Sequence, residues 1–335
     1  MQSDLPSKNT RPAAAPAPAP ADMAASLSAE DVRQLLPALL QQLNQIILGK
    51  PDVVTHAVTC LLAGGHLLIE DVPGVGKTTL AHALAHSMGL EFARVQFTAD
   101  LMPSDLTGVS IYERSTEQFV FHPGPVFSQV LLADEINRAS PKTQSALLEA
   151  MEERQVSIEG RSHALPQPFF VIATQNPLEQ RGTQPLPESQ LDRFLMRISL
   201  GYPGREAEHA LLAGTPQRDL LKELPPIMHA IHLLQLQAQV QSVHAASNLI
   251  NYLQDLLAAT RSGQWFVQGL SPRAGLGILR AAKARALLEG RDYVVPDDIQ
   301  TILPATAAHR LVPVSHAGRG AIEQVRAMID AVPLA

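Results

Sequence analysis

The sequence predicts a three-layer α/β domain followed by an all-helical domain. In the first two thirds of the chain, short apolar runs alternate with segments of helical periodicity. Each run has the length of a strand buried on both faces of a parallel sheet, and the alternation is typical of such a sheet covered by helices. From Arg205 onward only helical periodicities occur. We therefore expect a core domain over residues 28–203 and a helical domain over residues 204–335.

An Ala/Pro-rich tail precedes the core domain. Residues 11–20 read RPAAAPAPAP, and repeated proline removes backbone donors and favours an extended chain. Such a segment cannot pack a hydrophobic core. We expect residues 1–27 to be a disordered tail outside the fold.

The composition is that of a globular protein without a membrane anchor. Of the 335 residues 46% are hydrophobic, and 26 Lys and Arg against 32 Asp and Glu give a net charge of -6. That balance provides no overall attraction to nucleic acid. The N-terminus lacks the apolar segment of a signal peptide, and the longest apolar stretch, residues 53–69, is too short and too polar to span a bilayer. We expect a cytoplasmic protein whose single cysteine, Cys60, is a buried, inert thiol.

The pattern places the elements in a definite order. A first helix begins after Ser28, which can form a capping box with Asp31, and ends near Leu48 and Gly49. Further core helices are expected over 52–62 and 77–88, and strands over 66–70, 126–133, 169–173 and 195–200. Two hairpins interrupt this order, 108–112 with 118–122 and 155–159 with a return near 163–166. The helical domain should contain helices over 206–212, 246–260, 272–288 and 296–307.

A glycine-rich loop lies between the first strand and the following helix. Its residues are Pro73, Gly74, Val75, Gly76, Lys77, Thr78 and Thr79. Glycines allow several backbone N–H groups to converge on phosphate oxygens, and the helix N-terminus adds a positive dipole. In such a loop Lys77 reaches the β- and γ-phosphates and Thr78 binds Mg²⁺. The general motif has glycine six residues before the lysine, where this chain has Asp71.

Two adjacent acids, Asp134 and Glu135, directly follow an apolar run. Acids at the end of a buried strand are costly unless something pairs them. Their position suits Asp134 as a partner of the metal and Glu135 as a partner of the attacking water. Together with the glycine-rich loop, the pair predicts hydrolysis of a nucleoside triphosphate.

Three further polar residues complete the candidate site. Asn176 follows the third apolar run, where its amide can orient a water molecule and sense the γ-phosphate, although Asn-Pro also starts turns. Arg193 precedes the apolar run 195–200. Arg273 falls in the first turn of a helix, where a cation is unfavourable unless an anion binds nearby. Each arginine alone is also typical of a surface ion pair.

Together these motifs resemble the MoxR family of AAA+ ATPases. The resemblance is carried by residues 70–78 (EDVPGVGKT), 134–139 (DEINRA), 173–177 (ATQNP), 186–194 (LPESQLDRF) and 271–274 (SPRA). It extends from about residue 44 to the end of the chain, and it implies that Asp71 belongs to this family's own loop. Arg181 departs from the pattern, because such proteins commonly carry a second acid in this stretch.

The resemblance implies a P-loop AAA+ core with an α-helical lid, ATP as substrate and Mg²⁺ as cofactor. By position, residues 73–79 would be Walker A, and Asp134 and Glu135 would be Walker B. Asn176 would be sensor 1, Arg193 the finger that acts on a neighbouring subunit's nucleotide, and Arg273 sensor 2. The resemblance also implies that the segment containing Ile47 and Gly49 packs on the adenine ring.

Family resemblance also implies a homo-oligomeric ring, most often a hexamer. It implies a chaperone-like role with a von Willebrand factor A domain protein as partner. The two expected hairpins resemble the helix-2 insert and the pre-sensor-1 hairpin of one AAA+ branch.

Other functions in that branch remain open, since it also contains metal chelatase motor subunits and replicative helicases. Helicases carry basic residues at their hairpin tips. Here the first tip, residues 113–117, reads ERSTE, and the second balances Arg154 and Arg161 against Glu152, Glu153 and Glu159. We therefore predict no nucleic-acid partner. A chelatase motor would need a tetrapyrrole-binding partner, and a non-catalytic scaffold would have lost Lys77, Asp134 or Glu135, all of which are present.

Overall fold

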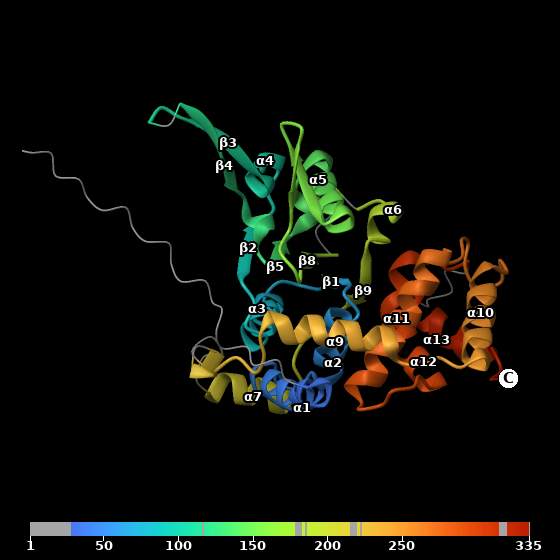
Figure 1. The fold of residues 1–335 in the computed structure, drawn as a ribbon. Coiled ribbons are helices and arrows are strands. Elements are labelled where there is room, and N and C mark those ends of the chain that lie inside the picture. The colour runs from blue at the N-terminus through green and yellow to red at the C-terminus, as the bar shows by residue number, and fades with distance from the viewer. Residues whose placement is uncertain are drawn as a thin grey trace, which may run out of the picture.

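The computed structural model describes residues 28–334, apart from 116, 178–182, 185, 215–219, 222 and 315–319. At its centre is a five-stranded parallel sheet with the order β2-β5-β8-β1-β9 (Figure 1). Its strands are β1 (His66–Glu70), β2 (Phe92–Gln96), β5 (Val130–Asp134), β8 (Phe170–Gln175) and β9 (Phe194–Ile198). The predicted tail, residues 1–27, and Arg181 lie outside the described residues.

Alternate strand residues enter two separate cores, as the two-residue repeat of a strand requires. Leu67 and Ile69 belong to a core shared with α1 (Ala29–Ile46), α2 (Pro51–Leu62) and α3 (Lys77–Ser87). Leu68 lies in the opposite core with α5 (Pro141–Glu153) and the short α4 (Pro103–Thr107). The sheet is therefore a middle layer between two helical layers.

Several predicted elements are confirmed, and three details differ. The capping box is present, because Asp31 N–H donates to Ser28 Oγ at 3.1 Å, but α1 ends at Ile46. The strand β2 was not predicted, since its side chains are only partly buried and two of its five residues are Arg94 and Gln96. The strand expected to begin at residue 126 begins at Val130, because Pro125–Phe127 forms a 3₁₀ turn, η1.

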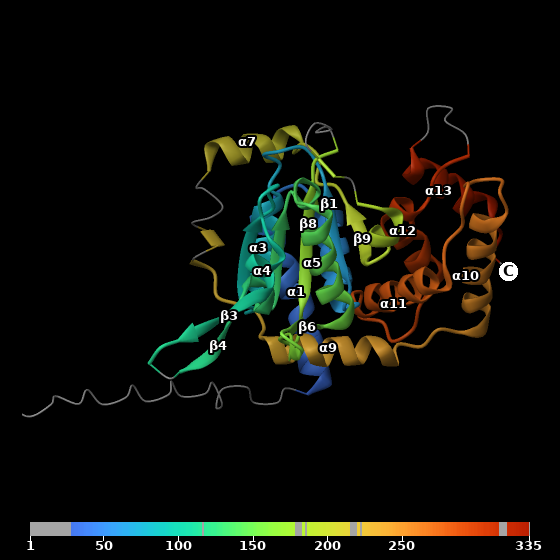
Figure 2. The ribbon, with the colours of Figure 1, turned by 90° about the horizontal axis from the view of Figure 1, so that it is seen from above.

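Both predicted hairpins are present as separate two-stranded sheets that extend from the core (Figures 1 and 2). The first pairs β3 (Gly108–Glu113) with β4 (Gln118–Pro123). The second pairs β6 (Gln155–Ile158) with β7 (Arg161–Ala164), so its return begins two residues earlier than expected. The cause is a two-residue turn in which Glu159 and Gly160 both have positive φ, 51° and 78°.

Helices make up most of the chain after Gly204. The longer ones are α7 (Arg205–Ala213), α9 (Ala230–Ser242), α10 (Ser247–Arg261), α11 (Pro272–Leu288), α12 (Pro296–Ala307) and α13 (Ala321–Ala331). The described residues also form the short helical elements η2 (Ile136–Arg138), α6 (Glu188–Leu191) and η3 (Ala308–Arg310). Helices α10 to α13 gather beside β9 (Figures 1 and 2), and α9 joins them to α1 and α2.

This arrangement confirms the predicted fold class, an α/β core with an all-helical C-terminal region. The bounds of α11 and α12 match the sequence prediction, because each begins on a proline at its first turn. The division of the chain at residue 203 stays a prediction. Within the described part of the chain, no helix is both long and apolar enough to cross a bilayer.

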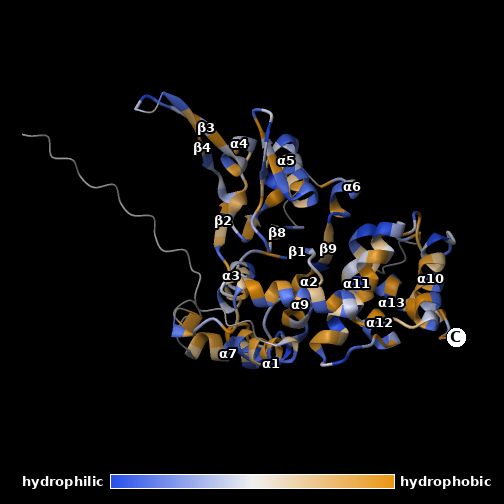
Figure 3. Ribbon diagram, viewed as in Figure 1, coloured by the Kyte–Doolittle hydropathy of each residue, from blue (hydrophilic) through white to orange (hydrophobic). Residues whose placement is uncertain are grey.

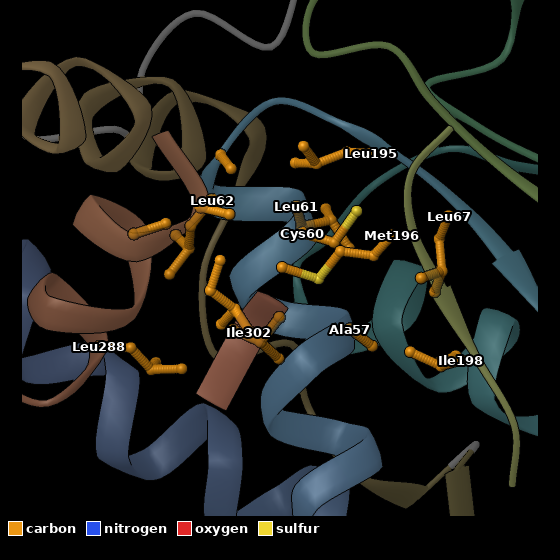
Figure 4. Packing of buried hydrophobic residues seen from close by; sticks show 14 of the residues in the cluster. Ala57, Cys60, Leu61, Leu62, Leu67, Leu195, Met196, Ile198, Leu288 and Ile302 are labelled. Carbon is orange, nitrogen blue, oxygen red and sulfur yellow. The ribbon is translucent and has the colours of Figure 1, made fainter. Parts of the chain in front are cut away.

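Cys60 is a residue of α2, and its side chain lies in the core near Leu61 and near Leu195 and Met196 of β9 (Figure 4). Its side chain is buried, as predicted, and the thiol donates to the carbonyl of His66 at 3.4 Å. Burial raises the pKa of the Cys60 thiol well above its usual range. The thiol is therefore protonated and unreactive at neutral pH.

His66 leads to a prediction for the pH dependence of stability. Its Nδ1 accepts the N–H of Val171 at 3.0 Å, so the buried ring is neutral, and burial lowers its pKa from 6.5 to about 4. As the pH falls below about 6.5 the unfolded chain binds this proton first, so the free energy of unfolding should decrease until about pH 4. The expected loss is on the order of 3 kcal/mol. Urea unfolding of wild type and His66→Gln between pH 7 and 4 checks this, and an equally steep pH dependence in both proteins would contradict it.

Candidate nucleotide site

The glycine-rich loop leaves β1 and enters α3 with two residues in the left-handed region. Gly74 has φ 86° and Gly76 has φ 99°, a conformation that disfavours any side chain. A Cβ on Gly74 would meet no atom within 4 Å, so the requirement there is conformational rather than steric. Gly76 is the N-cap of α3 and provides no side-chain cap. The N–H groups of the first turn are therefore available to an anion.

Lys77 and Asp71 fix the ends of this loop. The Lys77 ammonium donates to the carbonyls of Asp71 at 2.6 Å and Val72 at 3.0 Å. The Asp71 carboxylate accepts hydrogen bonds from Ser199 Oγ at 2.9 Å and from Gly201 N–H at 2.6 Å. Burial acts to raise the pKa of Asp71, but these hydrogen bonds outweigh it and hold the pKa below its usual range. The acid at the unusual motif position thus ties the loop to the segment that follows β9.

A cavity of about 520 Å³ lies beside this segment, lined by Leu48, Gly49 and residues 204–207 and 210. Gly49 has φ 70°, and a Cβ there would lie 2.9 Å from the Cβ of Ala207. The neighbouring Lys50 donates to the carbonyl of Tyr202 at 2.8 Å. The predicted adenine-side segment therefore borders a cavity, with Gly49 in its wall, while Ile47 is buried in the core.

At the end of β5, the hydroxyl of Thr174 connects the two predicted acids. This hydroxyl donates to Asp134 Oδ1 at 2.6 Å and accepts the N–H of Glu135 at 2.9 Å. Arg94 forms an ion pair with the other oxygen of the buried Asp134 carboxylate at 2.6 Å. Both oxygens of Asp134 are thus held from neighbouring strands.

Glu135 has φ 56°, an uncommon conformation for a side-chain-bearing residue. Its Oε2 accepts from Gln96 Nε2 at 2.9 Å and pairs with Arg138 Nε at 2.9 Å. Sequence reasoning missed Arg94 and Gln96 because it missed β2. The available signal was their spacing of two, which places both side chains on one face of a strand.

Asn176 is buried directly after β8, the strand that lies between β5 and β1. Across the β1–β8 pair, Asp71 N–H donates to the carbonyl of Gln175 at 3.1 Å. Because parallel strands end at the same edge, Asn176 lies at the edge that carries the glycine-rich loop and both acids. The structure thus brings together residues 73–79, Asp134, Glu135 and Asn176.

The two predicted arginines lie at the opposite edge of the sheet. Arg193 precedes β9, whose first residue, Phe194, is in register with His66 at the amino end of β1. Arg273 is the second residue of α11, and both guanidinium groups pair with Glu152, at 2.7 Å and 2.8 Å. The length of β1, roughly 13 Å, separates this group from the glycine-rich loop. Within one subunit, neither arginine joins the other predicted residues.

Comparison with known proteins gives consistent matches. The family described as ATPase family associated with various cellular activities (AAA) matches residues 66–196, and the AAA lid domain matches residues 258–330. The chain is 47% identical over 283 residues to the uncharacterized protein YeaC of Bacillus subtilis, covering 84% of this chain and 88% of that protein. It is 43% identical over 312 residues to Chaperone MoxR1 of Mycobacterium tuberculosis, covering 90% and 81%. A candidate ATPase from Cytophaga hutchinsonii superposes with a TM-score of 0.82 at 34% identity, over 92% of this chain and 97% of that one.

Proposed function

The chain belongs to the MoxR family of AAA+ ATPases, and we propose that it hydrolyses ATP as a ring of identical subunits, a hexamer. In this ring each active site combines the glycine-rich loop of one subunit with Arg193 and Arg273 of the next. One observation carries the proposal: both arginines lie at the edge of the sheet opposite the loop. A subunit that cannot bring its arginines to its own triphosphate needs a neighbour to complete the site.

The residues at the loop edge fit ATP together with Mg²⁺. The uncapped first turn of α3 and Lys77 supply donors for the phosphates. Thr78 and the buried Asp134 carboxylate supply hard oxygen ligands, the type that Mg²⁺ prefers when it binds with substrate phosphates. Bound there, the ion would offset charge on the β- and γ-phosphates.

Glu135 and Asn176 are the proposed partners of the attacking water. Glu135 polarises this water and accepts its proton, and the Asn176 amide orients it. Gln96 and Arg138 hold the Glu135 carboxylate on the side of β2, while Thr174 fixes its backbone N–H. The arginines of the adjacent subunit then stabilise the charge that develops on the transferred phosphoryl group.

Lys77→Ala should weaken ATP binding by roughly 10- to 100-fold, because the triphosphate loses a charge-assisted hydrogen bond in a partly desolvated loop. Calorimetric titration with a non-hydrolysable ATP analogue measures the effect. Lys142→Ala serves as the control, since Lys142 is an exposed lysine on α5. Equal affinity in the two variants would remove Lys77 from the site.

For the biological role, we propose a chaperone-like remodelling activity with a von Willebrand factor A domain protein as partner. The relative named Chaperone MoxR1 supports the first part, and the family resemblance implies the second. A chelatase motor is the nearest alternative, and it would require a tetrapyrrole-binding partner.

Nucleic acid is not expected to stimulate the ATPase. The turn of the β3–β4 hairpin is hydrophilic (Figure 3), and it exposes Arg114 and Glu117 beside the half-buried Glu113, so it offers few phosphate contacts. We expect binding of single-stranded DNA or RNA only in the ~10⁻⁴–10⁻⁶ M range at physiological salt. ATPase rates with single-stranded DNA, with RNA and with a purified von Willebrand factor A protein distinguish a nucleic-acid motor from the chaperone-like role. Several-fold stimulation by nucleic acid alone would overturn the chaperone proposal.

A further inference from the structure

Glu152 is the carboxylate to which both arginines are bound. Its Oε2 accepts from Arg193 Nε at 2.9 Å and Nη2 at 2.7 Å, and its Oε1 accepts from Arg273 Nη1 at 2.8 Å. Both carboxylate oxygens are thus in use. In the described part of the chain, Nη1 of Arg193 and Nε and Nη2 of Arg273 are left for further hydrogen bonds.

Glu152 lies among arginine side chains, and its negative charge offsets part of their positive charge. It lines a cavity of about 310 Å³ whose charged lining consists of Arg154, Arg193, Arg273, Arg280, Arg310, Asp192 and Glu152. Asp192 pairs with Arg310 at 2.8 Å, and Glu152 is the counter-charge for Arg193 and Arg273. Without it, the guanidinium groups of Arg193 and Arg273 would repel each other and lose their common anchor.

The hydrogen bond from Arg193, followed by that from Arg273, lowers the pKa of Glu152 below its usual range. The carboxylate is therefore ionised at neutral pH. It lies in the last turn of α5, which begins shortly after Glu135, and three residues before the hairpin strand β6. The 3₁₀ turn η2 and the helix α5 thus connect the predicted Walker B acids to the group that holds the arginines.

We propose that Glu152 is a positioning residue for ATP hydrolysis, whose carboxylate holds Arg193 and Arg273 together on the surface that receives the adjacent subunit's nucleotide. This inference rests on the proposed action of both arginines across the subunit boundary. An arginine side chain has several rotatable bonds and loses conformational entropy when it binds a phosphate. Because Glu152 already fixes both arginine side chains, less entropy is lost at that step. Glu152 acts through the arginines and does not touch ATP itself.

The test is Glu152→Gln with Glu153→Gln as its matched control. The amide keeps the size of the side chain but removes the charge, and one of its two ends becomes a donor that faces a guanidinium. We expect kcat to fall roughly 10- to 100-fold in Glu152→Gln, as when a supporting group is removed from a site. The KM for ATP should stay within about twofold of wild type, because the arginines belong to the neighbouring site. Glu153→Gln, exposed and next in the chain, should leave both values unchanged.

A double variant separates positioning from general destabilisation. Glu152→Gln should cause a smaller fold-loss of kcat in the Arg193→Ala background than in wild type, because only Arg273 is left for Glu152 to position. Glu152→Asp, which keeps the charge, should retain a higher kcat than Glu152→Gln. A wild-type kcat in Glu152→Gln, an equal fold-loss in the two backgrounds, or a kcat in Glu152→Asp no higher than in Glu152→Gln would each overturn the inference.

Failure of the underlying function gives a different result. If Arg193→Ala hydrolyses ATP at the wild-type rate, the proposed finger is wrong, whatever Glu152→Gln does. If Arg193→Ala is inactive and Glu152→Gln is fully active, only the positioning role of Glu152 fails.

Discussion

Glu135→Gln is expected to bind ATP with nearly wild-type affinity and to lose hydrolysis by roughly 10²–10⁴-fold, the usual contribution of a positioned general base. The carboxylate lies at the loop edge of the sheet and is oriented by Gln96 and Arg138, yet no part of the phosphate cradle depends on its charge. The amide can still accept from Gln96, so the fold should persist.

Steady-state ATPase rates and titration with a non-hydrolysable analogue measure the two effects separately. Glu149→Gln, an exposed glutamate on α5, is the matched control and should hydrolyse ATP normally. Equal hydrolysis by wild type and Glu135→Gln would remove Glu135 from the proposed mechanism.

Arg193→Ala should keep ATP binding and lose hydrolysis by up to ~10³–10⁵-fold, the range for arginine fingers in other NTPases. Binding should persist because Arg193 lies at the edge of the sheet away from its own subunit's loop. Arg326→Ala, on the exposed side of α13, provides a control with the same loss of charge. A large loss of ATP affinity in Arg193→Ala, with hydrolysis of the bound ATP unimpaired, would contradict a finger.

The sequence predicted strands that are both apolar and buried, and helices that begin with a capping residue. The strand His66–Glu70 is apolar and buried, and the helix Pro272–Leu288 begins with a serine cap and a proline. The strand Phe92–Gln96 was missed because it is an edge strand with partly buried side chains, so no continuous apolar run marks it. The apolar residues Val126 and Phe127 were read as strand although they form a 3₁₀ turn after Pro125.

The residues of the candidate site could be predicted from the sequence. Their division between the two ends of the sheet, with the arginines apart from the loop and the acids, could not. The glycine-rich loop and the two acids each follow a strand in the sequence. Because these strands are parallel, the residues that follow them lie at the same edge of the sheet. The contact of Arg273 with Glu152 joins residues 121 positions apart, and no periodicity indicates such a pairing. The support of Asp134 by Arg94 and Thr174 was hidden for the same reason, since both come from neighbouring strands.

Mixing Arg193→Ala with Glu135→Gln tests the central claim, that each active site is shared by two subunits. Either variant alone should be nearly inactive. In a mixed ring, some interfaces pair an intact Glu135 with an intact Arg193 of the adjacent subunit, so ATPase activity should reappear and vary with the mixing ratio. Exchange of subunits is verified in parallel by energy transfer between labelled chains. Activity restored in this way is the result we predict, whereas no recovery at any ratio, with exchange demonstrated, would contradict a site completed by the neighbouring subunit.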